Sequence, residues 1–179
     1  YLDLVALGTV ADVAPLIGVN RAFVRQGLKI LSTRQRLGLQ MLIDKSGLNS
    51  APTSYHLGYI LGPKLNAPGR IGPSDLAIKL LCSNSISEAT NLCEEIEELN
   101  LKRKEIENNV REEALEKVDE NQAKNSIIWA AAEGWHPGVV GIVASRLKDK
   151  FNKPALVIGF DGIEGKGSGR SVDGYDLGF

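Results

Sequence analysis

The chain has 179 residues, 43% of them hydrophobic, and its 21 basic and 22 acidic residues give a formal net charge of −1. This length fits one ordinary domain or two small ones. The near-neutral charge excludes a global electrostatic attraction to nucleic acid or to a membrane surface, so any basic site must be local.

The first half of the chain predicts a strand followed by short helices. Residues 2–7 form an apolar run before Gly-Thr-x-x-Asp, a pattern typical of a strand with Asp12 at its carboxyl end. Helices are expected from Asn20, over residues 38–45, and from Thr53 or Ser54. Residues 64–73 are rich in proline and glycine and predict a rigid, partly basic loop.

The second half predicts a long helix and then a β-α-β unit. Apolar residues recur at three- and four-residue steps over residues 86–118, which predicts a helix roughly 50 Å long. Such a helix suits a connection between two lobes, and the alternative is a solvated coiled-coil arm. Residues 126–132 and 154–160 are expected to be strands flanking a helix that begins after His136.

Nothing in the chain indicates a membrane span or secretion. No apolar run approaches the roughly 20 residues that cross a bilayer, and no signal peptide is recognisable at the start. Cys82 and Cys93 are too few for a disulfide scaffold or a zinc cluster, so we expect buried free thiols and a cytoplasmic protein with no membrane partner. Because the chain opens without methionine inside an apolar run, we interpret it as an internal piece of a longer protein.

Two segments near the end have the composition of phosphate-binding sites. A Gly-Trp-His-Pro-Gly turn places His136 beside the free N–H groups of a helix N-terminus. The segment from Gly165 to Ser171 is predicted to be a glycine loop, in which the backbone is accessible and Lys166, Ser168 and Arg170 supply donors for phosphate oxygens.

Each candidate site residue also has a purely structural interpretation. Asp12 is a metal ligand or a helix cap, and a single carboxylate cannot hold a catalytic cation. His136 either donates to a phosphate or packs in its turn, and Arg146 either reaches the same surface or complements a helix dipole. Trp129 and Trp135 are expected in the core rather than stacked on bases.

Four motifs occur in one order along the chain and resemble the RecJ single-stranded-DNA exonucleases of the DHH phosphoesterase superfamily. They are Gly8-Thr-Val-Ala-Asp12, Pro63-Lys-Leu-Asn-Ala-Pro-Gly-Arg70, the segment from Gly134 to Leu147, and Gly167-Ser-Gly-Arg-Ser171. The resemblance implies an α/β fold with three parts. Residues 1–84 would end a DHH catalytic domain, residues 85–120 would form a connecting helix, and residues 121–179 would form most of a DHH-associated domain with a mixed sheet.

The resemblance also implies roles for individual residues. Asp12 corresponds to the last metal-binding aspartate of a site for two Mn²⁺ or Mg²⁺ ions, and with His136 it is a candidate catalytic residue. The candidates for binding single-stranded DNA are Asn66, Arg70, His136, Arg146, Lys166, Ser168, Gly169, Arg170 and Ser171. Lys64 and Pro68 depart from the arginine and alanine common in the family, which weakens the case for a bidentate phosphate contact at residue 64.

The Asp-His-His motif of the family is not in this sequence, so we expect the fragment alone to be inactive. The resemblance implies a 5′-to-3′ exonuclease of recombination and repair, whose partners are single-stranded DNA, a single-stranded-DNA-binding protein and a helicase. Two alternatives stay open. One is a phosphodiesterase for short oligonucleotides or cyclic dinucleotides, and the other is a non-catalytic nucleic-acid-binding scaffold of replication.

Overall fold

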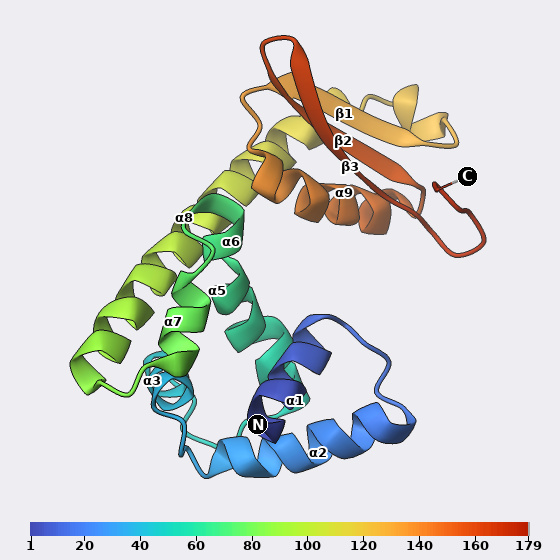
Figure 1. Cartoon of the computed structure of the whole chain (residues 1–179). Coiled ribbons are helices and arrows are strands. Elements are labelled where there is room, and N and C mark those ends of the chain that lie inside the picture. The colour runs from blue at the N-terminus through green and yellow to red at the C-terminus, as the bar shows by residue number, and fades with distance from the viewer. Residues whose placement is uncertain (179) are drawn as a thin grey trace. The chain divides into compact units, whose positions relative to one another are not determined.

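The computed structural model describes residues 1–178, which divide into an N-terminal unit, Tyr1–Asn100, and a C-terminal unit that begins at Leu101. The division falls within α8 (Ile86–Lys117), the long helix expected over residues 86–118 (Figure 1). The predicted mixed α/β class is confirmed, since helices accompany a three-stranded mixed sheet. The domain limits at residues 84 and 120 stay a prediction. No helix in the described part is long and apolar enough to cross a membrane.

All regular elements described in the N-terminal unit are helical. They are α1 (Leu2–Ala11), α2 (Gly18–Ser32), α3 (Leu37–Lys45), α4 (Ser54–His56), the π-helical turn η1 (Leu57–Leu61), α5 (Gly62–Asn66), α6 (Pro68–Ile71), α7 (Leu76–Cys82) and the start of α8. The core of the unit is made of fully buried side chains that include Leu39, Ile43, Leu57, Leu61, Leu80 and Ile96.

The strand predicted over residues 2–7 is wrong, because this segment is helix α1. A short apolar run does not distinguish a strand from a buried helix, and the neighbouring element decides here. Helix α2 approaches α1 at Gly27, where an added Cβ would lie 2.1 Å from the carbonyl oxygen of Leu2 and 2.5 Å from Cβ of Ala6. The missing side chain therefore lets two helices pack closely, and α1 has a helix rather than a strand as its partner.

The loop predicted over residues 64–73 is also wrong, because most of this segment is helical. Pro63 lies in the first turn of α5, and Pro68 is the first residue of α6. Proline is tolerated in a first turn because the N–H that it lacks has no partner within the helix there. The helix ends at Gly72, whose backbone is extended.

The C-terminal unit is a sheet in the order β1-β2-β3 that is covered on one face by helices (Figure 1). Its elements after α8 are η2 (Gln122–Lys124), β1 (Ile128–Glu133), α9 (Pro137–Phe151), β2 (Ala155–Asp161) and β3 (Glu164–Arg170). Strands β1 and β2 are parallel and joined through α9, which confirms the predicted β-α-β unit. The core between sheet and helices includes Val110, Ile128, Val139, Val143, Leu147 and Val157.

The glycine loop predicted from Gly165 to Ser171 is wrong, because residues up to Arg170 form strand β3. This strand pairs antiparallel with β2, from Asp161 opposite Glu164 to Ala155 opposite Arg170. A tight turn joins the two strands, and Gly162 adopts a φ of +60° in it, as such turns require. Backbone pairing with β2 thus makes a strand of a segment with poor intrinsic strand propensity.

Candidate functional site

Strand β3 alternates glycines on one face with polar and basic residues on the other. The glycines at 165 and 167 lie against side chains of β2, where an added Cβ would contact Phe160 and Ile158 respectively. On the opposite face, Ser168 and Arg170 lie against α9. Since side chains alternate along a strand, Lys166 belongs to this face too. The strand therefore brings three of the predicted site residues together and directs Gly169 to the other face.

Arg170 is held by hydrogen bonds from a single nitrogen of its guanidinium. Its Nη1 donates to Oγ of Ser168 over 2.9 Å and to the carbonyl oxygen of Gly169 over 2.7 Å. A guanidinium carries five N–H donors in a fixed plane, so the groups on Nε and Nη2 remain for another acceptor. The residue is exposed. A planar, exposed and oriented guanidinium of this kind can bind a phosphate or a carboxylate.

His136 caps the N-terminus of α9. Its Nδ1 accepts a hydrogen bond from the backbone N–H of Gly138 over 3.0 Å. Because Nδ1 acts as the acceptor, a neutral imidazole carries its proton on Nε2. His136 can therefore donate from Nε2 at a helix N-terminus, the end of a helix that attracts anions.

The two tryptophans have different environments. Trp135 is 4% exposed, and its Nε1 donates to Oε2 of Glu113 on α8 over 2.7 Å, which confirms the expected core role. Trp129 is 52% exposed on the sheet face opposite the core, so the same expectation is wrong there. An apolar strand buries only one set of its side chains when helices cover a single face.

Arg146 is anchored by a buried carboxylate that the sequence analysis missed. Its Nε lies 3.6 Å from Oε1 of Glu107, whose other oxygen accepts from Nη1 of Arg103 over 2.5 Å. Glu107 and Arg103 are 7% and 8% exposed, whereas the Arg146 side chain is 59% exposed. Arg103 and Glu107 are four residues apart in α8, the spacing of an ion pair on a helix, and this spacing could have identified the pair in the sequence.

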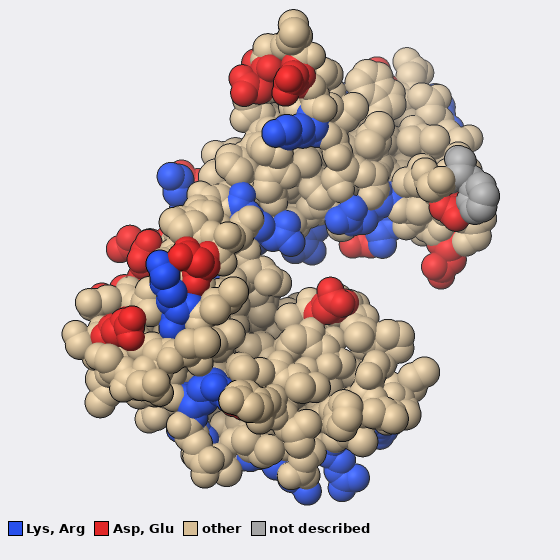
Figure 2. Space-filling model, in the orientation of Figure 1, with Lys and Arg blue, Asp and Glu red and all other residues tan. Residues whose placement is uncertain are grey.

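Positive charge is concentrated locally in the C-terminal unit. This is expected of any basic site, because the net charge of the chain is close to zero. Figure 2 shows Lys and Arg side chains in a row along the side of this unit where Figure 1 draws α9. The sequence of α9 contains Arg146, Lys148 and Lys150, and that of β3 contains Lys166 and Arg170. Ser171 follows the strand, and its hydroxyl donates to the backbone oxygen of Tyr175.

In the N-terminal unit, Asp12 follows the last residue of α1. It is exposed, and its carboxylate has no hydrogen-bond or ion-pair partner within residues 1–178. A negative charge at the C-terminal end of a helix opposes the helix dipole, typically by about 0.3–1 kcal/mol. The next residue, Val13, has a φ of +57°, a conformation that costs a β-branched residue about 1–2 kcal/mol. Two local costs at an exposed carboxylate are typical of a functional position.

The predicted motif with Asn66 and Arg70 lies on α5, which contacts α1, and on α6, which follows α5. Asn66 ends α5, Arg70 lies in α6, and both are exposed. Helix α5 begins at Gly62, where an added Cβ would lie 3.1 Å from Cβ of Ala11 in the last turn of α1. The close approach at Gly62 therefore links this segment to the end of α1 that presents Asp12.

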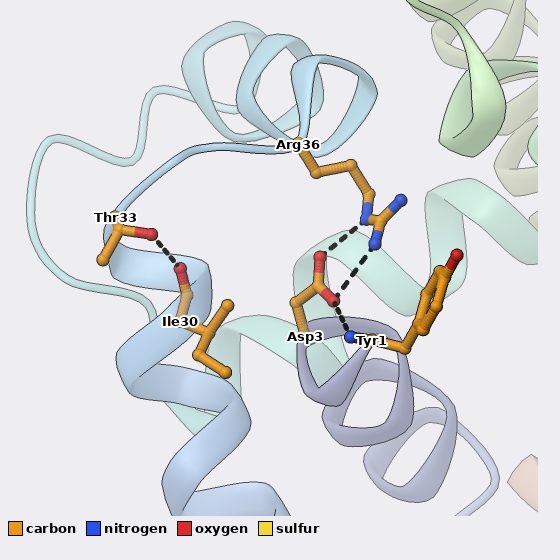
Figure 3. A network of polar contacts seen from close by, with 5 residues as sticks. All are labelled: Tyr1, Asp3, Ile30, Thr33 and Arg36. Carbon is orange, nitrogen blue, oxygen red and sulfur yellow. Dashed lines mark hydrogen bonds and ion pairs between the residues drawn. The ribbon is translucent and has the colours of Figure 1, made fainter.

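The described residues do not form a metal site by themselves. Within residues 1–178, no three His, Cys, Asp or Glu side chains are grouped so that they could hold a metal ion. Asp12 could supply one ligand. The nearest carboxylate in sequence, Asp3, is 5% exposed and pairs with Arg36, whose Nε lies 2.6 Å from Oδ2 (Figure 3). Asp3 thus has a structural role at the start of α1.

Both units match known proteins. Residues 124–178 match the DHHA1 domain family. The chain is 44% identical to the single-stranded-DNA-specific exonuclease RecJ of Bacillus subtilis over 98% of its own length and 23% of that protein. It matches the structure of Thermus thermophilus RecJ in complex with Mg²⁺ with a TM-score of 0.89 and 33% identity, covering 99% of this chain and 27% of that one. A structure of exonuclease RecJ bound to manganese matches with a TM-score of 0.84 and 33% identity, over 99% of this chain and 44% of that one.

Proposed function

Because this chain is homologous to the RecJ single-stranded-DNA-specific exonucleases along 98% of its length, we propose that it is the strand-binding segment of such an enzyme. It spans 23% of the Bacillus subtilis protein and 27% and 44% of the two solved chains, so the activity of a whole exonuclease belongs to this proposal. The observation that carries it is the oriented guanidinium of Arg170 on β3. Because the chain has a net charge of −1, it does not attract a polyanion as a whole. A local basic group such as Arg170 must therefore make the contact.

Arg170, Ser168 and the Nε2 proton of His136 bind phosphate groups of the strand. Phosphate contacts position a nucleic acid without reading its bases, which suits an enzyme that must accept every sequence. Lys166 lies on the same face of β3 as Arg170 and binds the strand with it, and Ser171 and Arg146 are further candidate contacts in this unit. Gly169 faces the other side of β3 and contributes backbone only. Asn66 and Arg70 are the candidate contacts within the N-terminal unit.

Asp12 supplies one carboxylate ligand to a site for Mg²⁺ or Mn²⁺, the ions named for the solved RecJ structures. Divalent ions in such sites activate water and stabilise charge on the phosphate. Since the described residues provide no complete set of ligands, the chain alone is inactive toward phosphodiesters. The remaining ligands come from sequence outside this chain.

The resemblance carries the rest of the proposal. The complete protein degrades single-stranded DNA in the 5′-to-3′ direction during recombination and repair in the cytoplasm. It works together with a single-stranded-DNA-binding protein and a helicase.

The test is a salt titration of the binding of this chain to a fluorescent single-stranded oligonucleotide, with duplex DNA and a dinucleotide as competitors. We expect salt-sensitive binding that neither competitor displaces efficiently. Arg170→Ala should weaken binding equally for all sequences and lower the salt slope by about 0.7 to 1 unit. Efficient displacement by the dinucleotide would instead favour a phosphodiesterase for short substrates. Absence of salt-sensitive binding would overturn the proposal.

A further inference from the structure

Gly141 lies in the second turn of α9, and the helix itself gives no reason for a glycine at this position. Glycine in a helix interior costs about 1 kcal/mol relative to alanine, and α9 continues for ten residues beyond this position. No positive φ requires glycine here, since Gly141 is not among the left-handed residues of the described chain. A tertiary contact must therefore account for it.

That contact is with the site residues of β3. An added Cβ at Gly141 would lie 3.0 Å from Oγ of Ser168 and 3.2 Å from Nη2 of Arg170. Both distances are tighter than those of most Cβ atoms in proteins, so the two polar atoms would have to move to admit a side chain. The guanidinium of Arg170 and the hydroxyl of Ser168 therefore occupy the space that a side chain on α9 would fill.

Gly141 differs in this respect from the glycines that support the fold. At Gly27, Gly38 and Gly159, an added Cβ would lie 1.9–2.1 Å from a backbone oxygen, so a side chain there would push whole elements apart. At Gly141 the nearest atoms are the ends of two polar side chains, which can rotate away. A methyl group would thus leave the packing of α9 on β3 intact but require Oγ of Ser168 and Nη2 of Arg170 to move by a few tenths of an ångström, which disturbs the geometry of the hydrogen bond between them.

We propose that Gly141 is a positioning residue for single-strand binding: its missing side chain leaves the space in which Ser168 and Arg170 hold each other in a phosphate-binding orientation. This inference rests on the proposed function, because it assumes that Arg170 contacts the strand. It adds a residue on α9 to a site that is otherwise built on β3 and at the N-terminus of that helix.

The experiment compares the wild type with Gly141→Ala, Arg170→Ala and the double variant in the same single-strand titration. We expect Arg170→Ala to weaken binding roughly tenfold or more, as loss of a charge-assisted hydrogen bond does, and Gly141→Ala to weaken it roughly three- to tenfold with a lower salt slope. In the Arg170→Ala background, Gly141→Ala should change affinity by less than about twofold, since coupled residues are not additive.

Thermal unfolding separates positioning from packing. Gly141→Ala should keep or raise the melting temperature, because alanine is the better helix former. Gly8→Ala is the matched control, because Gly8 lies in helix α1 and an added Cβ there meets nothing within 4 Å. This control should keep wild-type affinity.

The outcomes distinguish the two proposals. If the wild type does not bind the oligonucleotide in a salt-sensitive way, the proposed function fails. If the wild type binds and Arg170→Ala binds weakly, but Gly141→Ala retains wild-type affinity, only the inference about Gly141 fails. It also fails if the effect of Gly141→Ala persists in the Arg170→Ala background, or if the melting temperature falls together with the affinity.

Discussion

The buried ion pair between Asp3 and Arg36 should contribute measurably to the stability of the N-terminal unit, and Asp3→Asn tests this. Arg36 donates from Nε to Oδ2 of Asp3 over 2.6 Å and from Nη2 to Oδ1 over 3.3 Å (Figure 3). The side chains of Asp3 and Arg36 are 7% and 26% exposed respectively. The pair joins the start of α1 to the start of α3.

The expected loss follows from this burial. Removing one partner of a fully buried pair typically costs about 3–5 kcal/mol. Because a quarter of the Arg36 side chain reaches solvent, water partly compensates the unpaired guanidinium, and we expect Asp3→Asn to lower the free energy of unfolding by about 2 kcal/mol. Asp44→Asn is the matched control. Asp44 pairs with Arg34 in the same unit, but the side chains are 37% and 31% exposed, so its loss should cost at most about 1 kcal/mol.

The pH dependence gives a second, independent measurement. Burial alone would raise the pKa of Asp3, but the hydrogen bonds and positive charge of Arg36 outweigh it and lower the pKa below its ordinary value of 3.8. A carboxyl group whose pKa is lower in the folded state stabilises that state above its unfolded pKa. This contribution disappears as the pH falls through the folded pKa. The difference between wild type and Asp3→Asn should therefore be constant above about pH 5 and shrink below about pH 4.

Urea unfolding followed by far-UV circular dichroism measures both effects. Tryptophan fluorescence is unsuitable as the main signal, because Trp129 and Trp135 both lie in the C-terminal unit. A difference at pH 7 below about 0.5 kcal/mol, or one that grows on acidification, would refute the reasoning about this buried pair.

Three further predictions concern other parts of the chain. The expectation of a buried thiol is wrong for Cys82, which is exposed, and confirmed for Cys93. Near pH 8, a thiol reagent should therefore label Cys82 quickly and Cys93 only after unfolding, because burial raises the pKa of the Cys93 thiol to about 11. In a full-length exonuclease that carries this segment, Asp12→Ala should lower metal-dependent cleavage at least about a hundredfold and change strand affinity less than about twofold; retained cleavage would remove Asp12 from the metal site. Trp135→Phe should cost about 1–2 kcal/mol in urea unfolding through its lost hydrogen bond to a charged acceptor, whereas Trp129→Phe should cost much less, and equal losses would contradict the difference in burial.

The sequence predicted those elements whose pattern is long or whose boundaries carry strong signals. The apolar period over residues 86–118 is too long for chance and corresponds to α8. The strands around His136 are bounded by turn residues, and the helix between them begins at Pro137, a favoured residue for a first turn. The site residues of the last motif were found from their chemistry, even though their backbone conformation was predicted wrongly.

Tertiary contacts decided the rest. Residues 2–7 fit a strand or a helix equally well, and the close approach of α2 at Gly27 selects the helix. Residues 164–170 have weak strand propensity, and pairing with β2 makes them a strand that turns Ser168 and Arg170 toward α9. The sequence by itself thus determined which groups are available to bind a phosphate. Only the folded chain determined which of them meet, because that depends on strand register and on a glycine contact between residues far apart in sequence.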